Sequence, residues 1–229
     1  MRRETKNFLE KEELLTKQTF AQEWPVVYNL LQLAPKPACL IAHYGLRYDF
    51  RIILNELRRN YASLKIYPIP DDVYFIDSYL AFVDLEKEYH DSIKRAINEV
   101  ARAKHCVFQG PHALRFLKSE EWSPAKRHRI DSNIFEQTCE GNWRFNDAFG
   151  DNYFRGKGNF KLRNIYKKII GDDFNAHQAE ADTEALLQVS MSYGKEFINY
   201  VDTHRAPFPN LDVNNIVIMK GQNNALVDL

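Results

Sequence analysis

The chain has 229 residues, in which 31 Lys and Arg side chains balance 31 Asp and Glu, and it contains only three cysteines. With 45% hydrophobic and 27% charged residues, the composition is typical of a globular protein and excludes a wholly disordered, collagen-like or disulfide-dense chain. Apolar runs of at most five residues predict no membrane span, and the start lacks a secretory apolar region. Together with the odd, widely spaced cysteines, this predicts a cytoplasmic or nuclear location.

The charges are unevenly distributed along the chain. Residues 101–170 carry a net charge of +7, whereas residues 171–229 carry −6. A basic segment beside an acidic one indicates either a polyanion-binding surface next to carboxylates that bind cations, or two regions that pair with each other. The sequence leaves both possibilities open.

The first half of the chain predicts alternating helices and strands. Helical spacing of leucines over 5–33 ends at Ala34-Pro-Lys-Pro, and an apolar run over 38–45, ended by glycine, predicts a buried strand. A helix is predicted over 47–59 and a second short strand over 73–77. A strand, a helix and a strand within about forty residues form a βαβ unit, which favours an α/β fold.

The second half is less regular. We predict a long insertion with some short helices over 104–158, a helix over 160–170 that ends at Gly171, and the longest helix from 179 to about 201. Proline residues from 207 onward stop that helix. We therefore expect one domain over 1–208, followed by a C-terminal tail over 209–229.

Two short segments carry residues suited to chemistry. Asp49 follows a glycine turn at the carboxyl end of the first strand, where open α/β sheets bind ligands, although an aspartate here could also cap the next helix. His177 precedes a predicted helix whose first turns contain Asp182. A histidine can act as a general base near neutral pH and an aspartate suits Mg²⁺, but a solvated first turn with acids favoured by the helix dipole is the competing interpretation.

These segments resemble motifs of a known family of nucleases. Leu40-Ile-Ala-His-Tyr-Gly-Leu-Arg-Tyr-Asp-Phe50 and His177-Gln-Ala-Glu-Ala-Asp182 resemble the second and third motifs of the DEDDh exonucleases. The segments around Phe75-Ile-Asp-Ser78, Leu162–Tyr166 and Tyr200–Phe208 extend the likeness to the three-prime repair exonuclease family, over about 5–95 and 158–208. The resemblance implies a ribonuclease H-like fold, with helices packed on a short mixed sheet.

The resemblance also implies an activity, which is 3′→5′ removal of nucleotides from DNA. In the family, four carboxylates hold two Mg²⁺ ions, which Mn²⁺ can replace, and a histidine activates the attacking water. The expected partners are single-stranded DNA or DNA 3′ ends and, as in the family, a second copy of the chain. The positions carried over are Asp49 and Asp182 as metal ligands, His177 as general base, and Arg47, Tyr48 and Lys161 near the substrate.

The chain also departs from the family pattern. The first motif, an Asp-x-Glu on the opening strand, is missing, and Phe8-Leu-Glu-Lys-Glu12 has similar spacing but is helical in character. We therefore expect the chain to begin after the family's first three strands, which include the dimer strand. Tyr44 replaces an asparagine, and Arg51 replaces a proline. An incomplete exonuclease domain, inactive alone, is the expectation; a catalytically dead nucleic-acid-binding paralogue and a product without independent function are the alternatives.

Overall fold

The computed structural model describes residues 15–102, 123–126, 135–137, 139–140, 143–145 and 159–208. The helix expected before residue 15, with its acid-x-acid segment, most of the predicted 104–158 insertion and the tail over 209–229 lie outside the described residues. The chain divides into two compact units. Unit 1 comprises Met1–Leu40, Leu46–Phe75 and Ala206–Leu229, and unit 2 comprises Ile41–Gly45 and Ile76–Arg205.

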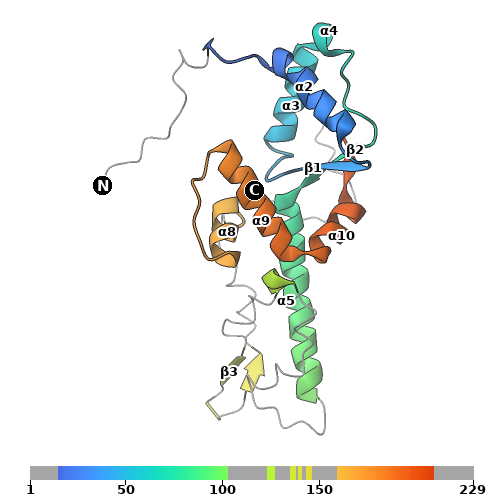
Figure 1. The fold of residues 1–229 in the computed structure, drawn as a ribbon. Coiled ribbons are helices and arrows are strands. Elements are labelled where there is room, and N and C mark those ends of the chain that lie inside the picture. Colours follow the sequence, from blue (N-terminus) through green and yellow to red (C-terminus); the bar gives the residue numbers. More distant parts are fainter. Residues whose placement is uncertain are drawn as a thin grey trace, which may run out of the picture. The chain divides into compact units, whose positions relative to one another are not determined.

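Helices and short strands follow one another along the chain (Figure 1). In chain order they are α2 (Phe20–Leu33), β1 (Ala38–Ala42), α3 (Asp49–Arg59), α4 (Tyr61–Leu64), β2 (Val73–Asp77), α5 (Ser78–Arg102), β3 (Phe135–Gln137), β4 (Trp143–Phe145), α8 (Leu162–Ile169), α9 (Ala179–Tyr193), α10 (Lys195–His204) and β5 (Ala206–Pro207). No described helix is both long and apolar enough to cross a membrane.

The main sheet is small, with the strand order β1-β2-β5. β2 pairs antiparallel with β5, so that Tyr74 lies opposite Pro207 and Phe75 opposite Ala206. α3 and α4 connect β1 to β2, which confirms the predicted strand, helix and strand. The described residues therefore form an α/β fold with helices around a small mixed sheet, which is consistent with part of a ribonuclease H-like fold. A separate hairpin of β3 and β4 falls within the segment that was predicted to be a long insertion with some short helices.

In unit 1, aromatic side chains fill the core. The Trp24 indole is 3% exposed and donates a hydrogen bond to the Tyr67 carbonyl at 2.9 Å. The Phe50 ring, from the start of α3, packs edge-on against Phe75 of β2, with 4.9 Å between ring centroids. The prediction that the first strand is buried was wrong, because β1 lies at an edge of the described sheet and its residues are half-buried or exposed.

In unit 2, α5 is the longest described helix and packs against α10. The core around it is aromatic: Phe82, wholly buried, stacks on Tyr193 with 5.0 Å between centroids and also contacts Phe197. The single long helix predicted from 179 to about 201 was wrong. Gly194, at φ +58°, separates α9 from α10, because a left-handed backbone ends a right-handed helix and glycine adopts it without steric penalty.

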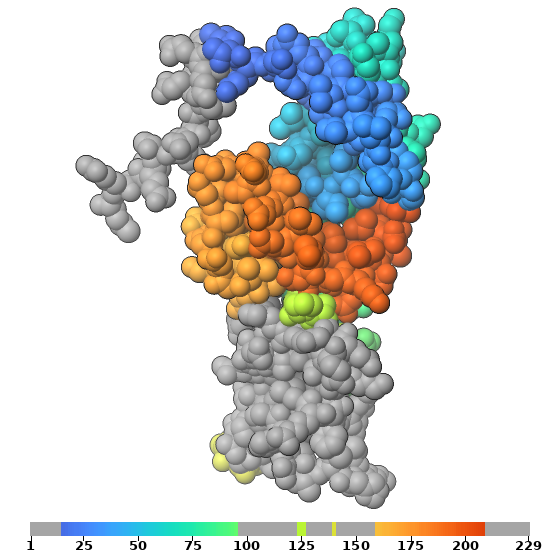
Figure 2. Space-filling model, viewed as in Figure 1, coloured from blue at the N-terminus to red at the C-terminus, as the bar shows by residue number. Residues whose placement is uncertain are grey.

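The predicted helix over 160–170 is confirmed as α8. It buries Ile165, Tyr166 and Ile169 and packs against α9, and the two helices form adjoining orange surfaces in Figure 2. Gly171 follows the helix at φ +84°, as expected for a glycine that ends a helix.

Candidate functional site

His177 and Asp182 are held together at the start of α9. The Asp182 carboxylate accepts a hydrogen bond from the His177 backbone N–H, at 3.3 Å to Oδ1 and 3.2 Å to Oδ2. His177 has a left-handed backbone, at φ +74°, which costs a non-glycine residue about 1–2 kcal/mol. The hydrogen bond to Asp182 stabilises this loop conformation, so that the exposed imidazole projects from a backbone tied to the first turns of α9.

Asp182 keeps acceptor capacity beyond this bond. A carboxylate offers about four lone-pair positions, and a single N–H occupies the space in front of its two oxygens. Asp182 is half-buried, whereas Glu180, in the first turn of the same helix, is exposed. The arrangement is thus more specific than a solvated acidic turn, because one acid of the pair organises the loop that carries the histidine.

Asp49 lies in unit 1, at the first residue of α3. The N-cap of this helix is Tyr48, and no side chain makes a capping hydrogen bond there, so the interpretation of Asp49 as a side-chain cap was wrong. Arg47, Tyr48 and Asp49 are all exposed, with Tyr48 at 62%. A carboxylate in the first turn is still favoured by the helix dipole. The structure therefore presents these three predicted residues to solvent.

The predicted site residues fall into two groups. Arg47, Tyr48 and Asp49 belong to unit 1, whereas Lys161, His177 and Asp182 belong to unit 2. Within the described ranges, no three His, Cys, Asp or Glu side chains gather as potential ligands of one metal ion. The donor chemistry of Asp49 and Asp182 suits Mg²⁺, but the described residues supply only part of a donor set.

His43 is a member of the second motif to which sequence reasoning assigned no role. Its Nε2 lies 2.7 Å from the Phe160 carbonyl oxygen, and its Nδ1 lies 3.0 Å from Ser78 Oγ. Because a carbonyl can only accept, Nε2 carries the hydrogen and the Ser78 hydroxyl donates to Nδ1. Burial lowers the pKa of His43 to about 4, an effect that the bond to Phe160 only partly opposes. The imidazole is therefore neutral near pH 7 and joins β1, α5 and the start of α8.

Tyr44 follows His43 in a left-handed turn, at φ +63°. The Asp77 carboxylate, 6% exposed, accepts hydrogen bonds from the N–H groups of Tyr44 and Tyr79, both at 3.0 Å. Asp77 thus caps α5 and holds the turn. Asparagine, which the resembled family has at this position, adopts a left-handed backbone more readily than tyrosine does. The tyrosine nevertheless keeps the turn, and its ring stacks on Tyr79 with 4.0 Å between centroids.

Lys161 is exposed and immediately precedes α8. Its chain neighbour Phe160 contacts the Tyr79 ring edge-on at 6.0 Å between centroids and binds His43 through its carbonyl. Two residues later, Arg163 forms a bidentate pair with Asp173, at 2.9 and 2.7 Å, and this hydrogen bonding lowers the pKa of Asp173. Lys161 is therefore an exposed basic residue that directly follows, along the chain, the phenylalanine that contacts His43 and Tyr79.

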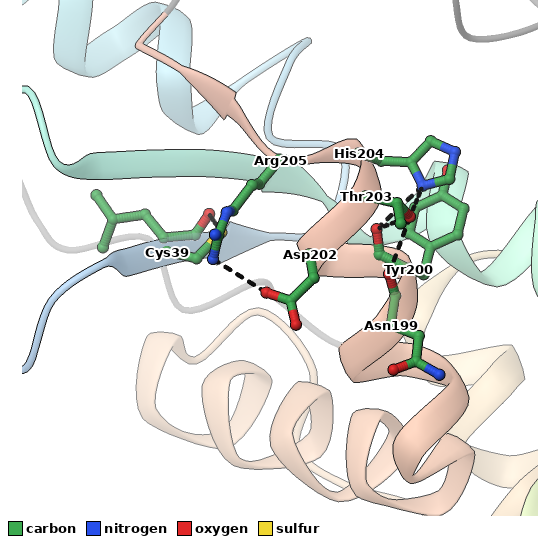
Figure 3. A network of polar contacts seen from close by, with 8 residues as sticks. Cys39, Asn199, Tyr200, Asp202, Thr203, His204 and Arg205 are labelled. Atoms are coloured by element: carbon green, nitrogen blue, oxygen red, sulfur yellow. Dashed lines mark hydrogen bonds and ion pairs between the residues drawn. The ribbon is translucent and has the colours of Figure 1, made fainter.

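The segment Tyr200–Phe208, which continues the likeness beyond the third motif, forms contacts that stabilise the end of α10 (Figure 3). The His204 ring stacks on Tyr200 at 4.0 Å, and its Nδ1 lies 3.0 Å from the Tyr200 carbonyl oxygen. Arg205 forms an ion pair with Asp202 at 3.0 Å. The Tyr200 hydroxyl donates to Asp84 of α5 at 2.8 Å, and burial together with this carboxylate raises the pKa of the phenol. These contacts terminate α10 and attach it to α5.

Comparison with known proteins gives a distant match. The chain is 24% identical over 184 residues to three-prime repair exonuclease 1 of Bos taurus, which is 80% of this chain and 38% of that protein. The chain thus spans well under half the length of this relative. No protein-family model matches the chain. The likeness agrees with the motif resemblance and points to the nucleases as the broad class of protein to which this chain is related.

Proposed function

We propose that the chain belongs to a metal-dependent exonuclease that removes nucleotides from the 3′ ends of DNA. The observation that carries this proposal is the hydrogen bonding of the Asp182 carboxylate to the backbone N–H of His177, which ties the residue that carries the imidazole to a carboxylate in the first turns of α9. The distant likeness to a three-prime repair exonuclease supports the same chemistry.

In this proposal His177 accepts a proton from the water that attacks the terminal phosphodiester. The phosphorus–O3′ bond breaks as the new bond forms, and a mononucleotide leaves. Asp49 and Asp182 are the proposed carboxylate ligands, and Mg²⁺, when bound, neutralises charge that develops on the phosphate. Arg47, Tyr48 and Lys161 are proposed to contact the substrate, as basic and aromatic side chains commonly do with nucleic acids.

Because we expect the chain to be inactive by itself, the test is shortening of a 5′-labelled single-stranded oligonucleotide in Mg²⁺ by the full-length gene product that contains this chain. Replacing His177 with Ala removes a general base, a change that typically costs 10²–10⁴-fold in rate, so we expect about a 100-fold loss or more. Asp182→Asn should cause a similar loss, because the amide oxygen still accepts the His177 N–H but carries no charge. Glu180→Gln, in the same exposed turn, is the matched control and should stay within about twofold. Unchanged shortening by His177→Ala would contradict the proposal.

A nucleic-acid-binding protein without cleavage is the second candidate. The observation in its favour is that no three potential metal ligands gather among the described residues. Binding of single-stranded DNA without shortening, in either Mg²⁺ or Mn²⁺, would support this candidate over the exonuclease. A complete lack of binding at low salt would exclude both.

A further inference from the structure

Unit 2 contains an aromatic pair that the proposed roles do not use. The rings of Tyr44 and Tyr79 are stacked, with an interplanar angle of 27°, and both side chains are half-buried, so part of each remains accessible. The His43 ring lies edge-on to both, at 5.4 and 5.9 Å between centroids, and Phe160 lies edge-on to Tyr79. Two hydrogen bonds fix the His43 ring, so the two tyrosines pack against a side chain that is held in place.

The backbone under this pair is strained. Tyr44 is one of two described non-glycine residues with positive φ, and the other is His177. Strained residues persist only where surrounding contacts hold them, and they occur preferentially at binding and catalytic sites. Here the Asp77 carboxylate holds the turn by accepting a hydrogen bond from the Tyr44 N–H. The strain therefore presents a tyrosine ring at a place where asparagine or glycine would fit the backbone better.

A basic residue that follows Phe160 in the chain indicates which class of ligand the pair could bind. Lys161 is exposed and directly follows Phe160, whose ring contacts Tyr79. Aromatic faces beside cationic side chains are the chemistry by which proteins hold single-stranded nucleic acids, since bases stack on the rings while phosphates meet the charges. An intact duplex keeps its bases stacked inside the helix, so the arrangement favours a single strand.

We propose that Tyr44 and Tyr79 form a stacking site for a base of single-stranded nucleic acid, with Lys161 contacting the neighbouring phosphate. This inference rests on the proposed nucleic-acid substrate and assigns it a binding position in unit 2.

The experiment measures fluorescence anisotropy of a labelled single-stranded oligonucleotide in EDTA, which prevents cleavage, and of an abasic oligonucleotide of equal length. Stacking on an aromatic residue is worth about 1–3 kcal/mol per base, so Tyr79→Leu and Tyr44→Asn should weaken binding of the base-containing strand about tenfold or more. Neither variant should change binding of the abasic strand. Lys161→Gln should weaken both complexes by the same factor.

Tyr61→Leu is the control, because Tyr61 lies on α4 in unit 1 and its side chain is 68% exposed. Tyr44→Asn suits the left-handed turn, so its thermal unfolding midpoint should be no lower than that of the unchanged chain. Undiminished binding by both tyrosine variants, or equal losses on the two oligonucleotides, would overturn the stacking site alone. Failure of the unchanged chain to bind either strand would overturn the stacking site together with the proposed function.

Discussion

His43 titrates far from the pH at which an ordinary histidine does, and this has a consequence for stability. Its pKa is lowered to about 4 because burial disfavours the charged imidazolium. In the unfolded chain the same group titrates near pH 6.5. Below pH 6.5 the unfolded state therefore binds a proton that the folded state does not, and folding loses stability as the pH falls toward 4. The loss amounts to about 3 kcal/mol and levels off below that pH.

Urea unfolding at pH 7.5 and pH 4.5 measures this effect. His43→Gln keeps an N–H donor for the Phe160 carbonyl but cannot be protonated in this range, so its stability should fall by less than that of the unchanged chain between the two pH values. His204→Gln is a useful control, because the His204 ring stacks on Tyr200 at the end of α10 and its Nδ1 lies near the Tyr200 carbonyl oxygen, contacts different from those of His43. Parallel pH profiles for the unchanged chain and His43→Gln would show that His43 is not the responsible group.

Single residues differ in how far the sequence could predict them. Asp49, His177 and Asp182 are candidates from the sequence alone because each lies in a compact motif whose spacing is visible in the chain, and their roles stay predictions. The environment of His43 was not predictable, because its partners Ser78 and Phe160 are 35 and 117 residues away along the chain. Tyr44 was noticed as a departure, but only the folded backbone shows that it retains a left-handed turn.

Among the elements, α2 has two apolar faces. Trp24 and Leu31 lie in the core of unit 1, at 3% and 7% exposure. Leu30 and Leu33 lie on the other side of the helix, at 62% and 82% exposure. Because Trp24 and Leu31 are seven residues apart, they lie on the same helix face, which is the one that packs.

Replacing each of two adjacent leucines of α2 with alanine compares the contributions of the two faces to stability. Leu31→Ala should lower the free energy of unfolding by about 2–4 kcal/mol, because it removes buried methyl groups and leaves a cavity. Leu30→Ala should change the free energy of unfolding by no more than about 0.5 kcal/mol, because its side chain already contacts water. Chemical denaturation of both variants makes the comparison. An equally large loss for Leu30→Ala would mean that the outer face of α2 is covered in the folded protein.

The elements that local patterns specify were predicted, and those that depend on distant partners were not. β2 and α8 have clear apolar patterns and flanking breakers, and both were confirmed. The sequence of 179–201 predicted one continuous helix. The structure has two, because the positive φ of Gly194 ends α9 although the residues on both sides of it form helices. β5 was not predicted, since two residues acquire strand character only through their pairing with β2.

At the scale of the whole molecule, the resembled motifs divide between two compact units. The second motif contributes His43 and Tyr44 to unit 2 but Arg47, Tyr48 and Asp49 to unit 1, so the boundary between the units passes through it. The third motif, with His177 and Asp182, lies entirely in unit 2. A motif that is continuous in sequence thus supplies residues to two bodies, and spacing along the chain could not reveal that division.

The net charge of zero conceals a basic segment over 101–170. The salt dependence of binding to single-stranded DNA tests whether this segment contacts phosphates. Each phosphate contact releases counterions from a single strand, so the logarithm of the binding constant should fall linearly with the logarithm of salt concentration between about 50 and 200 mM. Lys161→Gln should reduce the steepness of this slope by about 0.7, the value for one phosphate contact on a single strand.

Lys65→Gln is the control for this slope, because Lys65 is exposed at the end of α4 in unit 1 and should leave it unchanged. A slope near zero for the unchanged chain would mean that the basic segment does not meet phosphates. The remaining explanation for the charge asymmetry would then be pairing of residues 101–170 with the acidic residues of 171–229. In that case salt should lower the free energy of unfolding of the chain, because screening weakens attraction between opposite charges.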